Sequence, residues 1–188
     1  MKNFIRIAVT CLAFAAFAFG QADESAVKVT SLNMPANSTT GEVSGNIEDG
    51  QKISLRWAES SSVACFPGTR FEMFNGNNVF YRVTLPAASA MKITVTPADG
   101  KAINLYALRQ GSKSTDAPPN ISSAISCEAS YPIYANLGGG RQVKNKDDGT
   151  RKVEYISVNS PYSILIGVAG ANGLTEGDFK LNIEIKPR

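Results

Sequence analysis

The segment ACFPGTRFEMF places Cys65 in a Pro-Gly loop, close in the chain to Arg70. A cysteine beside a cation is one arrangement that produces a reactive thiolate. A nucleophilic cysteine also needs a base that takes its proton, most often a histidine, and the chain has no histidine. Arginine does not supply that base, because it keeps its own proton at any ordinary pH. The lack of histidine also excludes Ser-His-Asp triads, histidine-ligated zinc and histidine general bases.

Carboxylate chemistry survives this exclusion, because a glycosidase assembles its two acidic side chains in space and not along the chain. The sequence offers Glu72, Glu128 and Glu154 as candidates. Each of them also fits an ordinary solvent-facing position on a strand or loop. A small hydrolase that cleaves a polysaccharide with paired carboxylates therefore stays open as an alternative function.

The number of cysteines favours a structural role for Cys65. The chain has three cysteines. Cys11 lies in an apolar N-terminal run, which leaves Cys65 and Cys127. An even number of cysteines in an exported protein predicts a disulfide, so we expect these two residues to be joined. A free thiol, or a pair that exchanges disulfides, is the alternative.

The N-terminus has the features of a secretory signal peptide. Lys2 and Arg6 flank the start of the apolar run IAVTCLAFAAFAFG, which is too short to span a bilayer as a helix. Small residues follow at positions that a signal peptidase prefers. We therefore expect residues 1–22 to be removed, residues 23–188 to form one domain, and the protein to be periplasmic or secreted without a membrane span. A retained N-terminal anchor is the alternative.

The charge balance gives no support for nucleic-acid binding. The chain carries 19 basic and 16 acidic residues, and without Lys2 and Arg6 the balance falls to 17 against 16. A protein that binds a polyanion typically shows a dense basic stripe. The most basic stretch, residues 141–152, is interrupted by Asp147 and Asp148. It is therefore typical of a solvated loop or hairpin.

Alternating apolar and polar residues predict β-strands in several segments. The alternation is present in QKISLRWA (51–58), NVFYRVTL (78–85), MKITVTP (91–97) and FKLNIEI (179–185). No helical periodicity persists beyond about two turns after the signal peptide. Turn sequences rich in Gly, Pro, Asn and Asp separate the strands, so we predict an all-β fold, either an antiparallel β-sandwich or a barrel.

A long irregular insertion is expected at about residues 110–145. Pro118 and Pro119 hinder strand pairing, and the three glycines from Gly138 to Gly140 loosen the backbone. The segment between them contains Cys127 and could add a strand or lie across a sheet edge. A disulfide to Cys65 would then pin the insertion to the body of the domain.

Three segments resemble the bacterial pre-peptidase C-terminal domain family, over about residues 78–185. Residues 78–97 are similar to its opening pair of strands, and AINLYALRQG (102–111) is similar to its Asp-x-Asp-Leu-Tyr strand. Residues 162–185 are similar to its closing hairpin, where Gly177-Asp178-Phe179-Lys180-Leu181 stands for Gly-x-Tyr-x-Leu. The resemblance implies a jelly-roll sandwich like the collagen-binding domains of secreted collagenases. It also implies an accessory role that binds or tethers without performing chemistry.

Two departures from the family pattern bear on metal binding. Ala102 and Asn104 stand where the family often has Asp, and their substitution removes the charge that calcium prefers. The segment NKDDG (145–149) does not match an EF-hand loop, because lysines would fall at ligand positions. We therefore expect no metal and no other cofactor, and the residues give calcium no support.

The candidate binding residues are aromatic, because binding surfaces favour Tyr, Trp and Arg. Phe80 and Tyr106 alternate onto the less apolar faces of their strands, and Tyr131 and Tyr134 lie in the insertion. Ordinary sheet packing is the alternative for each of them. The sequence thus predicts an exported, non-enzymatic β-sandwich that recognises a protein, glycan or matrix partner through its loops.

Overall fold

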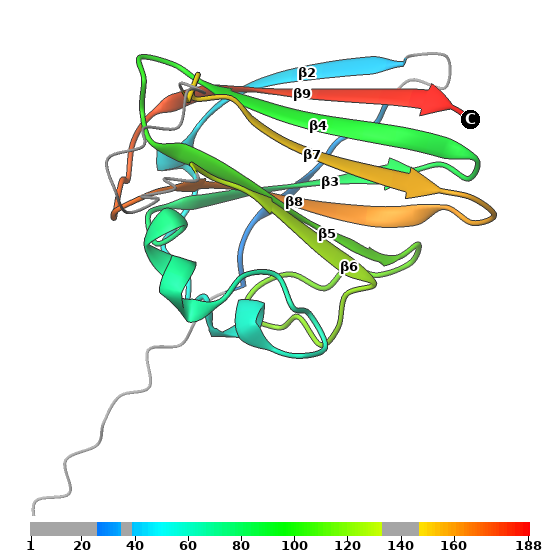
Figure 1. The fold of residues 1–188 in the computed structure, drawn as a ribbon, viewed down its shortest axis with the longest axis horizontal. Helices are drawn as coiled ribbons and strands as arrows, with labels where there is room; N and C mark the ends of the chain where they lie inside the picture. Colours follow the sequence, from blue (N-terminus) through cyan, green and yellow to red (C-terminus); the bar gives the residue numbers. More distant parts are fainter. Residues whose placement is uncertain (1–25, 35–38, 133–146) are drawn as a thin grey trace, which may run out of the picture.

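A computed structural model describes residues 26–34, 39–132 and 147–188 (Figure 1). The predicted signal peptide lies outside these residues. The described chain forms strands and short 3-10 helices, and its strands are β1 (Val29–Ser31), β2 (Thr40–Asn46), β3 (Asn78–Leu85), β4 (Ser89–Pro97), β5 (Ile103–Gly111), β6 (Ser126–Ser130), β7 (Arg151–Ser157), β8 (Tyr162–Gly170) and β9 (Asp178–Pro187). The 3-10 helices are η1 (Ile47–Asp49), η2 (Arg56–Glu59) and η3 (Gly68–Met73).

The strands form two sheets that pack face to face, which confirms the predicted all-β sandwich (Figure 1). Sheet A has the order β1-β3-β8-β5-β6, and sheet B has the order β2-β9-β4-β7. The chain crosses between the sheets repeatedly, as in a jelly roll. It passes from β3 in sheet A to β4 in sheet B and back to β5 in sheet A, and later from β7 in sheet B to β8 in sheet A and back to β9 in sheet B. One pair departs from the antiparallel expectation, since β1 runs parallel to β3.

The main core lies between the two sheets and is supplied by every second residue of their strands. Strand β9 illustrates this, because Leu181, Ile183 and Ile185 are buried while Lys180 and Lys186 face solvent. The segment FKLNIEI therefore has the alternation that its sequence predicts. Strand β4 follows the same rule with Ile93 and Val95. The residues between these buried positions face solvent and are mostly polar, so the outward face of sheet B is polar.

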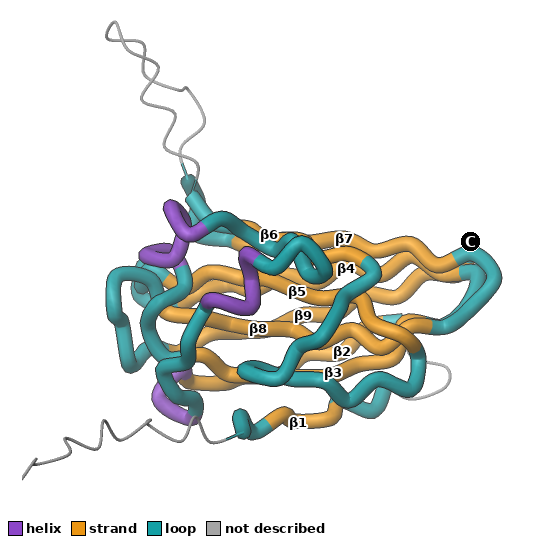
Figure 2. Tube along the Cα trace, turned by 90° about the horizontal axis from the view of Figure 1, so that it is seen from below, coloured by secondary structure: helices purple, strands orange, loops and turns teal. Residues whose placement is uncertain are grey.

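A third layer covers the other face of sheet A, and the sequence analysis did not predict it. Figure 2 shows η2, η3 and their loops lying across strands β8 and β5. Consequently β5 and β8 are buried on both faces, and their sequences INLYALRQ and SILIGVAG are nearly continuous apolar runs instead of alternating ones.

The segment QKISLRWA (51–58) belongs to this third layer, so the strand predicted there is wrong. Its backbone makes a single isolated bridge, between Gln51 and Asn78, and then turns into η2. Leu55 and Trp57 are nevertheless buried, because their side chains pack on the outer face of sheet A. The alternating apolar residues of this segment therefore reflect burial of these side chains and not pairing of a strand.

The expected insertion is only partly irregular. Strand β5 continues to Gly111, a loop follows, and Ser126–Ser130 pairs with β5 as the edge strand β6 of sheet A. Arg82 fixes the loop by donating hydrogen bonds to the carbonyls of Ser114 (2.9 Å) and Asp116 (2.7 Å). Residues 133–146 lie outside the described part.

Within the described residues, no helix is long and apolar enough to cross a membrane.

Candidate functional site

Phe80 and Tyr106 are buried, so their prediction as binding residues is wrong. Phe80 is 1% exposed and Tyr106 is fully buried. Both lie under the third layer, where Tyr106 contacts the rings of Trp57, Phe66 and Phe74. The Tyr106 hydroxyl donates a hydrogen bond of 2.8 Å to Oδ1 of the buried Asn78. The apolar third layer covers this face of sheet A, so both rings are buried although they point away from the core between the sheets.

Tyr131 is half-buried at the margin of the same layer. Its ring meets Phe74 edge-on at 5.7 Å between centroids, and the guanidinium of Arg70 lies 5.5 Å from its centroid. These contacts cover part of the ring, and the rest is accessible to solvent. Tyr131 does not form a shared binding surface with Phe80 and Tyr106, because those two residues are buried. Tyr134 lies outside the described residues.

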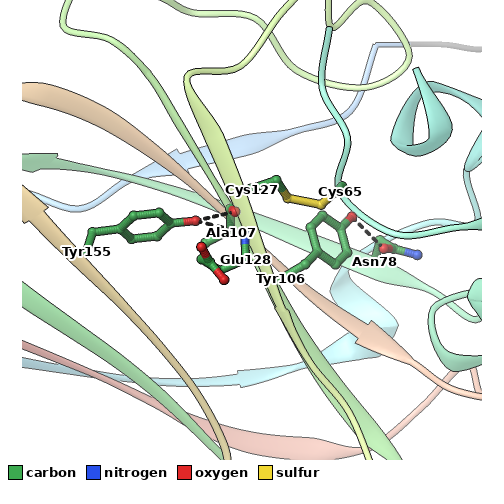
Figure 3. Close-up of a disulfide and its surroundings, with 7 residues drawn as sticks. All are labelled: Cys65, Asn78, Tyr106, Ala107, Cys127, Glu128 and Tyr155. Atoms are coloured by element: carbon green, nitrogen blue, oxygen red, sulfur yellow. Dashed lines mark hydrogen bonds between the residues drawn. A yellow bond between two sulfur atoms is a disulfide. The ribbon is translucent and has the colours of Figure 1, made fainter. Parts of the chain in front are cut away.

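Cys65 and Cys127 are joined in a disulfide, which answers the question of thiol reactivity in favour of a structural bond (Figure 3). Cys65 follows η2 in the third layer, and Cys127 is the second residue of the edge strand β6. The bond ties the third layer to sheet A across a sequence separation of 62 residues. A hollow of about 350 Å³ opens beside it, between Glu59 and Pro67.

The position that the family resemblance links to calcium is filled by an arginine. Arg151 donates from Nε to Asn104 Oδ1 (2.8 Å) and from both Nη atoms to the carboxylate of Asp147 (2.8 and 3.0 Å). Asn104 in turn donates to the Met73 carbonyl. The hydrogen bond from Arg151 is the main reason that the pKa of Asp147 is lowered. A bound guanidinium already supplies the positive charge here.

No group of three or more Cys, His, Asp or Glu side chains that could hold a metal ion occurs in the described ranges. The position beside Asn104 does not fit calcium for a chemical reason, because the guanidinium of Arg151 binds the side-chain oxygens of both Asn104 and Asp147.

The three carboxylates considered for hydrolysis lie on different elements. Glu72 is on η3, Glu128 is on β6, and Glu154 is on β7. Glu154 and Glu184 both line a hollow of about 260 Å³ on the outward face of sheet B, one on each side of Lys92 in the strand register. Lys92 Nζ lies 2.9 Å from Glu184 Oε1 and lowers the pKa of that carboxyl. A glycosidase general acid needs the opposite shift.

Side chains join the edge strands β6 and β7 where the two sheets meet. The Tyr155 hydroxyl, from β7, donates to the Ala107 carbonyl and accepts from the Glu128 amide (3.2 Å) (Figure 3). The Lys152 amide donates to Ser130 Oγ over 3.1 Å. Burial is the main cause that raises the pKa of Tyr155 above its ordinary value of 10.0, so the phenol stays neutral into the alkaline range. These bonds fix the spacing of the two strands along one side of the sandwich.

Beside these bonds lies the surface that we call the Arg109 edge, made of Arg109, Ile125, Ile156, Val158 and Tyr162. The Ile125 amide donates to the Arg109 carbonyl (2.7 Å), and Arg109 Nη1 donates to the Ile156 carbonyl (3.1 Å). The guanidinium lies 5.1 Å from the centroid of the Tyr162 ring. Strands β5, β7 and β8 and the residue before β6 thus meet around one arginine.

Three large apolar side chains at this edge are exposed. Ile125 is 53% exposed, Ile156 is 50% exposed and Val158 is 63% exposed. Isolated apolar residues on a surface need no explanation. Here the backbones of Ile125 and Ile156 are each hydrogen-bonded to Arg109, and Val158 lies two residues after Ile156. Arg109 and Tyr162 are of the residue types that are enriched at protein-binding hot spots.

The Arg109 edge is not recognisable in the sequence, because its residues are scattered along the chain. One local signal was present. In RKVEYISV the outward positions change from Lys152 and Glu154 to Ile156 and Val158, so the polar half of the alternation becomes apolar at the end of β7. An apolar residue at an outward position of an edge strand is the pattern that indicates a contact surface.

A further hollow, of about 630 Å³, lies at the opposite end of the outward face of sheet B. Its charged groups already have partners within the chain. Asn46 Nδ2 donates to Asp178 Oδ1 (2.8 Å), and Lys180 Nζ lies 3.5 Å from Glu42 Oε1. It contains none of the three exposed apolar side chains named above.

Fold and surface together define a two-sheet β-sandwich with an added third layer and an apolar edge. No protein-family model matches the chain, and no curated protein sequence matches it. Three solved structures are similar in fold. The first is a periplasmic inhibitor of g-type lysozyme, PliG, from Aeromonas hydrophila, with 12% identity, a TM-score of 0.44, and 84% of this chain and 96% of that chain covered.

The second structure is the pre-peptidase C-terminal domain of a collagenase from Bacillus anthracis, with 9% identity, a TM-score of 0.38, and 85% and 95% of the two chains covered. The third is CorA, a surface-associated copper-binding protein important in copper acquisition by Methylomicrobium album BG8, with 8% identity, a TM-score of 0.43, and 87% and 99% covered. These likenesses concern the fold alone, and at such TM-scores they carry no argument about function.

Proposed function

We propose that this protein is a non-enzymatic accessory module that acts outside the cytoplasm and binds a protein partner through the Arg109 edge. The observation that supports this most is the exposure of Ile156 and Val158 at and just beyond the end of the edge strand β7, where outward positions are otherwise polar. Burial of such side chains on binding contributes about 25 cal/mol per Å² of apolar area. An accessory role is also what the resemblance to the pre-peptidase C-terminal domain family implies.

Aliphatic side chains favour a protein over a glycan as the partner. A sugar typically packs its C–H face on an exposed aromatic ring. The outward residues of sheet B, on strands β2, β9, β4 and β7, include no aromatic residue within the described ranges. At the Arg109 edge itself, Tyr162 is half-buried and its ring already lies beside the arginine.

Export is the second part of the proposal. The joined cysteines support it, because disulfides persist in oxidising compartments and are rare in the cytosol. The predicted signal peptide, residues 1–22, is consistent with a periplasmic or secreted protein. Fractionation of the producing cells is the direct check, and retention of the full-length chain in the cytosol would contradict this part.

Site-specific photo-crosslinking tests the binding proposal. A photo-reactive phenylalanine analogue replaces Val158 in one variant and Glu42 in another, and both are expressed in the organism that makes the protein. Glu42 is the matched control because it is 55% exposed and lies on β2, at the far edge of sheet B. We expect a discrete adduct with one protein from position 158 and none from position 42. Equal adducts from both positions, or none from position 158, would contradict the proposal.

A further inference from the structure

The two edge strands of sheet B are β7 and β2, and they lie on opposite sides of the sandwich (Figure 1). At β7, backbone groups that face away from sheet B have partners from sheet A. The Lys152 amide donates to Ser130 Oγ (3.1 Å), and the Ile156 carbonyl accepts from Arg109 Nη1 (3.1 Å). Side chains of the other sheet therefore close the β7 edge.

At β2, the backbone groups of Glu42 and Ser44 point away from the sheet. In an antiparallel pair every second residue bonds to the neighbouring strand, and the residues between them turn N–H and C=O to the other side. The Ile185 amide donates to the Thr39 carbonyl (2.7 Å), so the odd-numbered residues of β2 bond to β9. The N–H and C=O groups of Glu42 and Ser44 face the open edge and have no partner within the described residues.

Strand β2 also lacks the features that commonly prevent pairing at an open edge, which are prolines, bulges and inward-pointing charges. It contains no proline, and its 7 residues pair with β9 without interruption. Its inward positions are Gly41, Val43 and Gly45. Val43 packs against the main core and is only half-buried. An added strand would cover Val43 and supply partners for the free backbone groups.

We propose that β2 is a self-association edge, at which the β2 strands of two copies of this chain pair antiparallel about a two-fold axis through Val43. In this register Glu42 of each copy lies opposite Ser44 of the other, and the two residues exchange N–H···O=C bonds. The two copies of sheet B then form one continuous sheet. Such a contact uses the same patch on both copies, so it closes at a dimer.

Charges on the outward face favour this register. Lys180 lies opposite Ser44 in the pairing of β2 with β9, and its Nζ is 3.5 Å from Glu42 Oε1 of the same chain. In the dimer, Glu42 of one copy therefore also lies beside Lys180 of the other. Carboxylates and ammonium groups then alternate around the axis, and opposite charges on neighbouring strands stabilise a sheet.

The two neighbouring registers keep the backbone bonds but bring like charges together. A shift in one direction places Glu42 directly opposite Glu42 of the second copy, which destabilises a sheet. A shift in the other direction places Glu42 opposite Asn46 of the second copy, whose Nδ2 donates to Asp178. The register through Val43 is therefore the one that the charges select.

This contact goes beyond the proposed function, because β2 is the sheet edge farthest from β7 and leaves the Arg109 edge free for its partner. One pair of strands is smaller than a standard interface of about 1,600 Å², so we expect a weak dimer. A phenylalanine analogue at position 42 removes the carboxylate that selects the register. That crosslinking variant should stay monomeric and serves as the control for position 158.

Small-angle X-ray scattering of the disulfide-intact protein tests the proposal. The apparent mass of the unaltered protein should rise towards that of a dimer as its concentration increases to about 1 mM. Glu42→Lys and Lys180→Glu each gather like charges around the axis and should weaken the dimer at least about ten-fold. An equimolar mixture of these two variants should dimerise again, because each copy brings the charge that the other lacks.

Lys101→Glu is the matched control, because it makes the same charge change outside β2 and β9 and should dimerise as the unaltered protein does. If a charge variant does not fold, Ser44→Pro replaces it, since proline removes an outward N–H and should abolish the dimer. An unaltered protein that stays monomeric throughout would overturn the proposal. A dimer that the variants at β2 leave unchanged, or a mixture that stays monomeric, would overturn it as well.

Discussion

Gly167 and Tyr106 lie opposite each other on strands β8 and β5, and a Cβ atom on residue 167 would overlap the Tyr106 ring. The ring occupies the space that a side chain would take. Gly167 is therefore required by close approach and not by backbone conformation. This contact fixes how Tyr106 lies beneath the third layer, next to Trp57 and Phe74.

The variant Gly167→Ala is expected to destabilise the protein. The Tyr106 ring is fully buried and packed on several aromatic neighbours, so it has little room to move. Overpacking of this kind costs about 1–3 kcal/mol of unfolding free energy. Urea unfolding measures the change. Gly111→Ala, at the end of the neighbouring strand β5, is the matched control, because an added Cβ there meets nothing within 4 Å. Equal losses in the two variants would refute the packing account.

Removal of the Tyr106 hydroxyl is expected to lower stability through Asn78. The variant Tyr106→Phe leaves Asn78 Oδ1 buried without its donor, which costs about 1–3 kcal/mol. Tyr131→Phe serves as the control, because its hydroxyl makes no hydrogen bond within the described residues, and should change stability by less than about 0.5 kcal/mol. Thermal and urea unfolding of both variants would show the difference, and identical stabilities would contradict it.

Stability is expected to fall at alkaline pH. Burial raises the pKa of Tyr106 and of Tyr155 in the folded protein above the ordinary value of 10.0. The unfolded chain ionises these phenols near pH 10 while the folded chain keeps them neutral. Their contribution is therefore complete below that pH and is lost as the pH rises above it, by up to about 1.4 kcal/mol per pH unit for each group. Urea unfolding between pH 8 and 11 measures the slope, and a flat profile would contradict the burial of these phenols.

The disulfide is expected to stabilise the attachment of the third layer. A bond that closes a loop of 62 residues contributes about 4 kcal/mol in the chain-entropy account. Reduction, or the double variant Cys65→Ala with Cys127→Ala, should lower the melting temperature. Thiol titration of the denatured, unreduced protein should find neither Cys65 nor Cys127 free. Reactive thiols at both positions would show that the bond does not form.

The sheets could be predicted from the sequence where one face of a strand meets solvent. Strands β4 and β9 have such a face, so their residues alternate and the pattern indicates both the strand and its inward side. Strands β5 and β8 are covered on both sides, and there the alternation that would identify an outward face does not exist. Tyr106 was assigned to a surface for that reason.

The third layer and the Arg109 edge depend on topology, which no local pattern encodes. The buried Leu55 and Trp57 have a strand-like spacing although they belong to loops and a 3-10 helix. Arg109 and Ile156 meet because β5 and β7 sit near the same side of two different sheets. The pairing of Cys65 with Cys127 was predictable, because compartment and cysteine number leave few alternatives.

The most direct test of the central claim is to measure how tightly the partner identified by crosslinking binds a variant that lacks two of the three exposed apolar side chains of the Arg109 edge. The double variant Ile156→Ser with Val158→Ser is compared with Glu42→Ser combined with Lys180→Ser on the far edge of sheet B. All four side chains are exposed, so the fold should tolerate both changes, which unfolding curves verify. We predict that the first variant binds at least about ten-fold more weakly, or about 1.4 kcal/mol, and that the second binds as the unaltered protein does. Unchanged affinity of the first variant would contradict the central claim.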